Sequence, residues 1–552
     1  MMIAISANGT RRQLENWSHI QWQKAYKLVK NLRQRIFRAR KLGNFKTLRS
    51  LQKLMQRSYA NLLLSVRRIT QTNKGKATAG INKEIINTPE QRVTLVNNWK
   101  GGNLQPTRRV EIPKPNGKKR PLGIPTVRDR IEQAIIKNSL EPEWEAVFEP
   151  HSYGFRPGKS CQDAIAQCFN RMCMSHTGKD IWVLEADIRG FFDNIAHESI
   201  LNLINNFPKR DLIQGWLKAG FVLDGKINPT EMGTPQGGVI SPLLANIGLH
   251  GLETYLKSTN SKLGVIRYAD DFIVTARDKG SLETAQVQIQ QWLSLRGLEL
   301  SSEKTFITSV EEGFDFLGFN HRHYNGKLLI KPTKKKVLDF CNRLGKEIKA
   351  LNGAKQEDVI SKLNPILRGF ANYYKGVVSK ETFVYISHRV WQYLWRWAKR
   401  RHPNKNTKWV YDAYFKTIKG VKWTFACIVS NRFDKEVLNS LYPINKTPIE
   451  RHTKVKGEAS PDDPSLKEYW KKRNQKLDKS HWAKGSKYYL VAQNQKWKCP
   501  ICGEPLLNGE SIETHHIVPV AQGGLDDISN LQHLHISCHK QVHSKSKFSS
   551  LK

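Results

Sequence analysis

Two acidic side chains stand between two apolar runs of the chain. The pattern of residues 263–276 (LGVIRYADDFIVTA) predicts a hairpin of two buried strands with Asp270 and Asp271 at its tip. Adjacent carboxylates repel each other, and hard oxygen ligands favour Mg²⁺ as the cation that relieves the repulsion. Asp187 follows a second predicted strand, residues 181–186. If the strands are neighbours in one sheet, Asp187 and Asp270 can hold two ions about 3.5–4 Å apart, as in-line phosphoryl displacement requires.

Such a pair of aspartates is weak evidence by itself, because most Asp-Asp pairs at turns are simply solvated. A second pattern is more specific. Two half-sites near the end of the chain have the spacing of a tetrahedral zinc site with sulfur and nitrogen ligands. They are Cys499, Cys502, His535 and Cys538.

Further polar residues lie between and after these half-sites: His515, His516, Asn530, His539 and His543. A neutral imidazole is suited to taking a proton from water near neutral pH. His539 and His543 are four residues apart and therefore share one face of a helix. The simpler interpretation is a structural zinc ribbon with incidental histidines, but structural zinc does not need the adjacent His515 and His516.

The elements that position these residues belong to a long and strongly basic chain. It has 552 residues and a formal net charge of +42, which points to a polyanionic partner and leaves ample length for several domains. Residues 11–76 carry 18 Lys and Arg against one acid, Glu15, while apolar residues recur at helical spacing. We therefore expect a basic helical arm in contact with nucleic acid backbone.

The rest of the chain changes character in steps. Short β-rich runs alternate with helical patterns over residues 90–320, which predicts an α+β domain. Residues 330–420 are helical, basic and rich in tryptophan, where a packed core under a basic surface is favoured over base stacking. Proline and charge dominate residues 443–486, which predicts a linker or a loosely packed basic module. No apolar stretch is long enough to span a membrane.

Several segments together resemble reverse transcriptases, and specifically the multifunctional proteins encoded within group II introns. YADD at 268–271 is similar to their catalytic hairpin, and EADIRGFFDN at 185–194 to the strand with their first aspartate. The other matching segments are RVEIPKPNGKKRPLGIP at 109–125, YGFRPGK at 153–159, GTPQGGVISP at 233–242, LSSEK at 300–304, FLGF at 316–319 and NPILRGFANYYK at 364–375. They occur in the family's order, and the one small departure is Arg189, where relatives often have lysine.

The resemblance implies roles for individual residues of the polymerase. Asp187 and Asp270 are the expected Mg²⁺ ligands, and Asp271 is a supporting acid. The expected nucleotide-binding residues are Lys114 and Arg120 at the triphosphate, Phe192 as the gate against a ribose 2′-OH, Gln236 beside the nucleotide and Lys304 near the primer.

The last 60 or so residues resemble an HNH endonuclease of the ββα-metal type. By that resemblance His516 is the general base, and Asn530 orients the loop that carries it. His515 and His539, with His543 as a possible third, are ligands of one divalent metal, expected to be Mg²⁺. Relatives often have cysteine where this chain has His535, so His535 and His543 can exchange roles in this assignment.

The implied fold is a multidomain α+β protein built around a right-hand polymerase. The expected divisions are a basic helical N-terminal extension at 1–89, fingers and palm at 90–325, thumb and maturase domain at 326–420, a basic DNA-binding segment and linker at 421–486, and a zinc-stabilised HNH domain at 487–552. The implied function is an RNA-directed DNA polymerase and DNA endonuclease that assists intron splicing and carries out intron mobility.

The implied partners are the host group II intron RNA, double-stranded target DNA and dNTPs, with no membrane. Eight cysteines without a disulfide pattern indicate a reducing compartment, and the opening residues lack a secretory pattern. The bacterial cytoplasm or nucleoid is the expected location, with an organelle as the alternative. Two other functions remain open: a splicing factor with decayed catalytic sites, and a stand-alone, retron-like reverse transcriptase.

Overall fold

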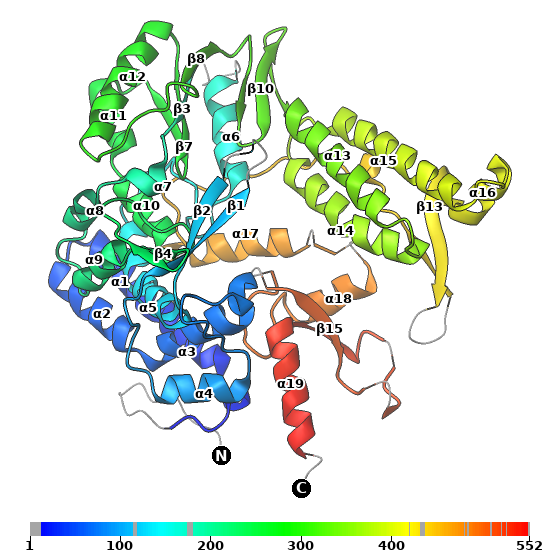
Figure 1. Cartoon of the computed structure of the whole chain (residues 1–552), viewed down its shortest axis with the longest axis horizontal. Coiled ribbons are helices and arrows are strands. Elements are labelled where there is room, and N and C mark those ends of the chain that lie inside the picture. Colours follow the sequence, from blue (N-terminus) through cyan, green and yellow to red (C-terminus); the bar gives the residue numbers. More distant parts are fainter. Residues whose placement is uncertain are drawn as a thin grey trace.

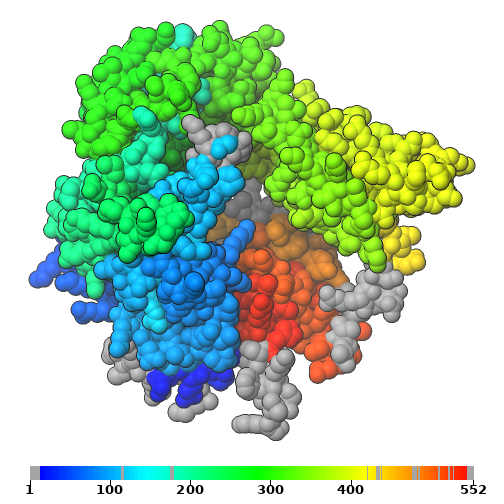
Figure 2. Space-filling model, viewed as in Figure 1, coloured from blue at the N-terminus to red at the C-terminus, as the bar shows by residue number. Residues whose placement is uncertain are grey.

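The structure is a computed structural model with four regions around a central opening (Figures 1 and 2). It describes residues 13–113, 117, 119–173, 180–418, 420–430, 436–479, 481–482, 485–507, 510–519, 522–525 and 527–549. None of the helices in these ranges combines the length and the apolar character needed to cross a bilayer.

The basic N-terminal region is helical, as its apolar spacing predicts. Leu48, Leu51 and Met55 form the buried stripe of α2, and Ser58 then breaks the predicted arm and caps α3 with its side chain. The helices are α1 (Trp22–Lys41), α2 (Phe45–Arg57), α3 (Tyr59–Arg67) and α4 (Pro89–Asn97), and α1 to α3 pack on α5 (Val127–Glu145).

A small sheet follows these helices in the order β2-β1-β4-β5. Its strands are β1 (Thr107–Pro113), β2 (Lys119–Ile124), β4 (Phe221–Leu223) and β5 (Lys226–Asn228). Only β1 and β4 are parallel among these pairs. The helices between and after these strands are α6 (Cys161–Met172), α7 (Phe191–Asn194), α8 (His197–Leu203), α9 (Arg210–Lys218), α10 (Ser241–Gly248), α11 (Leu252–Thr259) and α12 (Lys279–Ser294).

The central sheet has the order β6-β7-β3-β8, with every pair antiparallel. Its strands are β3 (Trp182–Asp187), β6 (Gly264–Tyr268), β7 (Asp271–Ala276) and β8 (Phe306–Ser309). Both faces are covered, because Leu184 belongs to the core on the α12 side and Val183 to the core on the α6 side. The two predicted acidic strands are thus neighbours deep in the protein.

A helical region extends to one side of this sheet (Figure 1). It begins after a three-stranded sheet of β9 (Phe314–Phe316), β10 (Phe319–Tyr324) and β11 (Lys327–Pro332). The helices are α13 (Lys334–Ala350), α14 (Gln356–Tyr374), α15 (Lys380–Arg401) and α16 (Thr407–Tyr414), followed by β12 (Phe415–Ile418), β13 (Val421–Ser430) and β14 (Glu436–Ser440). Because β12 pairs with β13, this region continues past the predicted boundary at residue 420.

Residues 443–486 were predicted to be a linker or a loosely packed basic module, but part of this segment packs closely on the fingers. The buried Asp163 at the start of α6 accepts hydrogen bonds from the Val455 backbone N–H at 2.8 Å and from Arg473 at 3.4 Å. Trp470 lies so close to Gly158 that a Cβ there would fall 2.6 Å from its ring. These contacts fasten α17 (Lys467–Lys479) and the chain before it to the fingers.

The chain ends in a ββα unit next to the N-terminal helices (Figure 1). The short helix α18 (Lys487–Asn494) precedes β15 (Ile512–His516) and β16 (Leu531–His535), which are antiparallel, and α19 (Ile536–Ser549) follows directly. This order of elements confirms the fold expected for the Cys/His segment.

Candidate functional sites

Strand register brings the three aspartates of the palm to one end of the central sheet. Asp187, the last residue of β3, lies opposite Asp271, the first residue of β7. Tyr268 pairs with Asp271 across the hairpin, so that Ala269 and Asp270 form the turn between β6 and β7. Ala269 has a φ of 59°, in the left-handed region that tight turns require.

The hairpin tip is held by residues that the sequence analysis did not single out. Arg267 is buried on β6 and donates to the Asn246 side-chain oxygen and to the Ala269 carbonyl oxygen, both at 3.1 Å. The Asn246 amide donates to the Gly154 carbonyl oxygen at 2.8 Å, and Gly154 lies against the turn. The sequence signal for this role was Arg267 itself, a charged residue within an otherwise apolar strand, because a buried charge must be paired.

Glycine at 154 is a steric requirement of this arrangement. A Cβ on Gly154 would fall 2.3 Å from the Ala269 backbone nitrogen, closer than any real contact. The YGFRPGK motif at 153–159 therefore supports the catalytic hairpin from behind. Lys159 of the same motif has a structural contact: its amine donates to the carbonyl oxygens of Pro150 at 3.1 Å and Gly457 at 2.6 Å.

The electrostatics of the aspartates favour a bound cation. Burial raises the pKa of Asp271 to about 6, and the carboxylates of Asp270 and Asp187 add to the rise. Burial also raises the pKa of Asp270, with Asp187 contributing and Arg120 opposing. The Lys304 amine donates to Asp187 at 2.8 Å. The donor chemistry fits divalent metal, although the aspartates are not drawn together as closely as the Cys/His groups below.

Two hydrogen bonds of the 233–242 loop connect elements that carry predicted nucleotide-binding residues, among those that the structure describes. Phe192 lies half-buried on α7, and its carbonyl oxygen accepts from the Thr234 N–H at 2.7 Å, which ties α7 to the 233–242 loop. The Gln236 carbonyl oxygen accepts from the Gly123 N–H at 2.8 Å, which ties the same loop to β2, the strand of Arg120. Arg120 is exposed. Lys114 lies outside the described residues.

The FLGF motif at 316–319 is held by the motif at 364–375. Its turn contains Leu317 and Gly318, both with φ in the left-handed region. The Tyr373 and Tyr374 hydroxyls at the end of α14 donate to the carbonyl oxygens of Leu317 and Gly318 at 3.0 and 3.1 Å. The two predicted motifs therefore form one joint between palm and thumb.

Two groups of possible metal ligands occur in the described part of the chain, and both lie in the C-terminal unit. Cys499, Cys502, His535 and Cys538 are all buried, and their ligand atoms lie within 4.8 Å of one another. The His535 Nδ1 atom lies 3.3 Å from the Cys502 sulfur, and its Nε2 atom donates to the Pro505 carbonyl oxygen at 3.0 Å. That contact fixes the tautomer that turns Nδ1 toward the sulfurs, so the fit to zinc is good.

His515, His539 and His543 form the second group. The His539 Nε2 atom lies 3.1 Å from the His515 Nδ1 atom and 3.0 Å from the His543 Nε2 atom, and three ring nitrogens that converge in this way fit one metal ion. Burial lowers the pKa of His515 to about 4, and the neighbouring histidines add to the decrease, so its ligand form is favoured. The structure thus places His535 with the cysteines and His543 with the histidines.

Glu513 is a functional candidate that the sequence analysis missed. Its carboxylate accepts from the His539 Nδ1 atom at 2.5 Å, which turns Nε2 of that ring toward the other histidines. Its position two residues before His515 on β15 was the available signal, because alternate residues of a strand share a face.

Asn530 closes the loop that follows His516. Its side-chain oxygen accepts from the Val518 N–H at 2.8 Å, and its amide donates to the carbonyl oxygens of Val518 at 3.0 Å and Leu525 at 2.8 Å. His516 ends β15 opposite Leu531 and is half-buried. The predicted residues of the nuclease therefore come from β15, from the turn before β16 and from α19.

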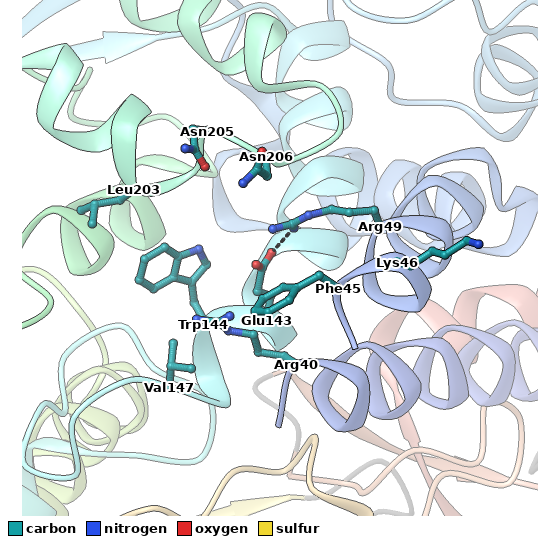
Figure 3. Close-up of a pocket in the computed structure, with 10 residues that line it drawn as sticks. All are labelled: Arg40, Phe45, Lys46, Arg49, Glu143, Trp144, Val147, Leu203, Asn205 and Asn206. Atoms are coloured by element: carbon teal, nitrogen blue, oxygen red, sulfur yellow. Dashed lines mark hydrogen bonds and ion pairs between the residues drawn. The ribbon is translucent and has the colours of Figure 1, made fainter. Parts of the chain in front are cut away.

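A pocket of about 550 Å³ lies elsewhere, between the N-terminal helices, α5 and the end of α8 (Figure 3). Arg49 is paired there with Glu143 at 2.8 Å, and Arg40, Lys46 and Phe45 also line it. None of the aspartates or histidines described above contributes to this pocket.

Comparison with protein families assigns these regions. The family of reverse transcriptases (RNA-dependent DNA polymerases) matches residues 112–321, and the N-terminal domain of reverse transcriptase matches 17–99. The maturase-specific domain of group II introns matches 339–415, and the HNH endonuclease family matches 499–545.

Curated relatives decide the family. Group II intron-encoded protein LtrA of Lactococcus lactis subsp. cremoris is 31% identical, across 55% of this chain and 67% of that protein. Protein YkfC of Escherichia coli (strain K12) is 34% identical, across 46% and 79%. The chain belongs to the group II intron-encoded proteins. A telomerase structure from Candida albicans aligns over 55% of this chain and 64% of its own, with 12% identity and a TM-score of 0.32. One from Candida tropicalis aligns over 52% and 69%, with 14% identity and a TM-score of 0.33. Both TM-scores are too low to bear on the fold.

This group II intron-encoded protein is a reverse transcriptase with a maturase region and an HNH endonuclease domain, and its function lies in intron splicing and mobility. Intron RNA and DNA are its partners. Both enzyme domains belong to classes that work with divalent metals. The maturase and HNH matches leave the stand-alone, retron-like alternative without support.

Proposed function

We propose that the protein copies its host intron RNA into DNA from a 3′-OH that its own nuclease produces in the target. The observation that carries the polymerase half is the register of the central sheet, which sets Asp187 opposite Asp271 beside Asp270. Asp187 and Asp270 bind two Mg²⁺ ions, and Asp271 supports them. When bound, the two ions stabilise the attacking and leaving oxygens of the displacement.

The residues around the aspartates select and orient the dNTP. Arg120 and Lys114 bind its triphosphate, and Phe192 excludes a ribose 2′-OH. Gln236 lies beside the nucleotide on a loop whose glycines permit close approach. Lys304 neutralises Asp187, to which it donates at 2.8 Å, and lies on the primer side.

In the nuclease half, His516 takes the proton of the attacking water. His515, His539 and His543 bind one divalent cation, Mg²⁺ in our assignment, which when bound neutralises charge on the scissile phosphate. Glu513 orients His539, and Asn530 orients the loop after His516 through the hydrogen bonds described above. Structural Zn²⁺ bound by Cys499, Cys502, His535 and Cys538 holds the unit together.

The expected divisions 1–89, 90–325 and 487–552 stay part of this proposal. The thumb and maturase region, expected at 326–420, is extended through β14, because β13 pairs with both β12 and β14. The rest of the segment expected at 421–486 takes the target DNA. The basic N-terminal region and the thumb bind the host intron RNA during splicing. A cytoplasmic location stays a prediction from the sequence.

One assay tests the function as a whole. The protein is assembled with its intron RNA and incubated with double-stranded target DNA and labelled dNTPs. We expect label to become covalently joined to the nicked DNA strand. If dNTPs are incorporated but the DNA is not nicked, only the polymerase function is supported. If neither DNA synthesis nor nicking occurs while splicing is intact, the protein is a splicing factor with decayed catalytic sites.

A further inference from the structure

The Cys/His quartet does not lie in a core of its own. The cysteines and the apolar residues of the C-terminal unit share one buried cluster with the N-terminal helices. That cluster includes Trp17, Trp22, Val66, Cys499, Cys502, Leu506, Leu534 and Cys538. Contacts at its edge link the same two regions: Gln541 on α19 donates to the Ser18 carbonyl oxygen at 2.5 Å. The quartet therefore lies at an interface between segments separated by most of the chain.

Arg67 crosses this interface. It is the last residue of α3, and its side chain is 2% exposed. Its Nη2 atom donates to the Ser537 hydroxyl at 3.0 Å and to the Cys538 sulfur at 3.1 Å. Its guanidinium lies 4.5 Å from the centre of the Trp22 ring, which covers its other side. A buried arginine from the N-terminal region thus touches a sulfur of the quartet.

Charge explains why a cation belongs at this position. Three thiolates and one neutral imidazole around Zn²⁺ carry a net charge of −1, which is costly in a buried site. Arginine remains protonated in every environment and donates in a fixed, planar geometry. The nearest carboxylate to Arg67 is Glu510 at 4.0 Å, and the Arg67 Nε and Nη1 atoms have no hydrogen-bond partner in the described chain. Arg67 is therefore directed at the sulfur and hydroxyl rather than consumed by a close ion pair.

We propose that Arg67 is a positioning residue for the zinc cluster, and that the cluster is the joint that fixes the nuclease to the N-terminal helices of the polymerase. The proposal rests on the zinc site proposed above. Zinc binding and docking of the nuclease on the N-terminal helices are thermodynamically linked. Docking therefore raises the affinity for zinc, and bound zinc stabilises the docked arrangement by the same free energy. The nuclease is thus held at a set place relative to the polymerase.

The first experiment measures zinc release from the full-length protein to a colorimetric chelator. Arg67→Met keeps much of the volume and removes the charge and the donors, and Arg67→Lys restores the charge alone. We expect Arg67→Met to release zinc about 10- to 100-fold faster, with Arg67→Lys in between, as for other partners of metal ligands. Arg68→Met is the matched control, since Arg68 is adjacent but exposed, and it should release zinc like the wild type.

A spectroscopic measurement separates positioning from general support of the fold. In protein loaded with Co²⁺ in place of Zn²⁺, the thiolate-to-metal charge-transfer band should shift in Arg67→Met, because the Cys538 sulfur loses a charged donor. The band should stay unchanged in Arg68→Met. An unshifted band in Arg67→Met, with zinc release at the wild-type rate, would overturn the proposal.

Docking is measured by hydrogen exchange of β15, β16 and α19. Exchange there should speed up in Arg67→Met and equally in wild-type protein stripped of zinc, while DNA synthesis on a primed homopolymer template is retained. Unchanged exchange in both Arg67→Met and zinc-free wild-type protein would overturn the proposal that the cluster fixes the nuclease to the N-terminal helices. If Arg67→Met does not fold, Ser537→Ala decides, because it removes one Arg67 contact from the other side and should speed zinc release a few-fold. Wild-type protein without zinc would overturn the zinc site itself.

Discussion

The proposed polymerase and nuclease centres differ in the chemistry of their expected metal ligands and in the elements that support them. The polymerase ligands that we propose are Asp187, at the end of β3, and Asp270, in the turn before β7, and both faces of their sheet are covered by core. The nuclease ligands that we propose are imidazoles from β15 and α19, in a small unit whose buried residues are shared with the N-terminal helices. A large core therefore supports the first centre, whereas contacts with another region of the chain support the second. Because the two supports are separate, we expect that one centre can be disabled while the other stays active.

The largest expected effect is at the palm. Asp270→Ala should reduce RNA-templated DNA synthesis by about 10³-fold or more, which corresponds to about 4 kcal/mol of transition-state stabilisation. The reason is that the substitution removes a carboxylate that binds and positions the Mg²⁺ ions in our proposal. Incorporation of dNTPs on an RNA template measures it, with RNA binding and DNA nicking as the activities that should persist. Wild-type incorporation at the same Mg²⁺ concentration would contradict the assignment.

The reciprocal change is in the nuclease. His516→Ala should slow DNA strand cleavage by about 10²- to 10⁴-fold, because the general base is removed. Nicking of a labelled target is the measurement, and polymerase activity and zinc content should match the wild type. Persistent cleavage would place the base elsewhere.

The packing that supports the β6–β7 hairpin can be disrupted without changing a proposed metal ligand. Gly154→Ala adds a methyl group that would lie 2.3 Å from the Ala269 nitrogen, so the tip must shift. We expect DNA synthesis to fall about 10²-fold, since small misplacements of reacting groups have effects of this size. Gly353→Ala is the matched control, because a Cβ there meets nothing within 4 Å. Equal activity of the two variants would contradict the steric role, and nicking should be unchanged in both.

The smallest expected effect concerns selectivity. Phe192→Ala should lower discrimination between dNTP and rNTP by about 10-fold, since the clash of one hydroxyl with an apolar side chain has limited energy. Parallel incorporation assays with each nucleotide measure it. Unchanged selectivity would make Phe192, which packs against the core, an ordinary core aromatic.

Much of each site was predictable because its signals are local. Continuous apolar runs predicted the strands around Asp187 and Asp270, and apolar residues at helical spacing predicted the helices of the N-terminal region. Two short Cys/His half-sites predicted the quartet. The packing of residues 450–473 on the fingers was not predictable from composition. The proline and charge content of a segment indicates its local conformational preferences. It carries no information about the part of the protein on which the segment packs.

Local patterns of residues predicted the kind of element that each part of the chain forms, and the order of those elements. Those features follow from neighbours within a few residues along the chain. The contacts of Arg67 with Cys538, of Lys304 with Asp187 and of Gly154 with the hairpin turn are features of the folded chain alone. They join segments far apart in sequence, and their meeting depends on how strands register and how cores pack, which no local pattern encodes.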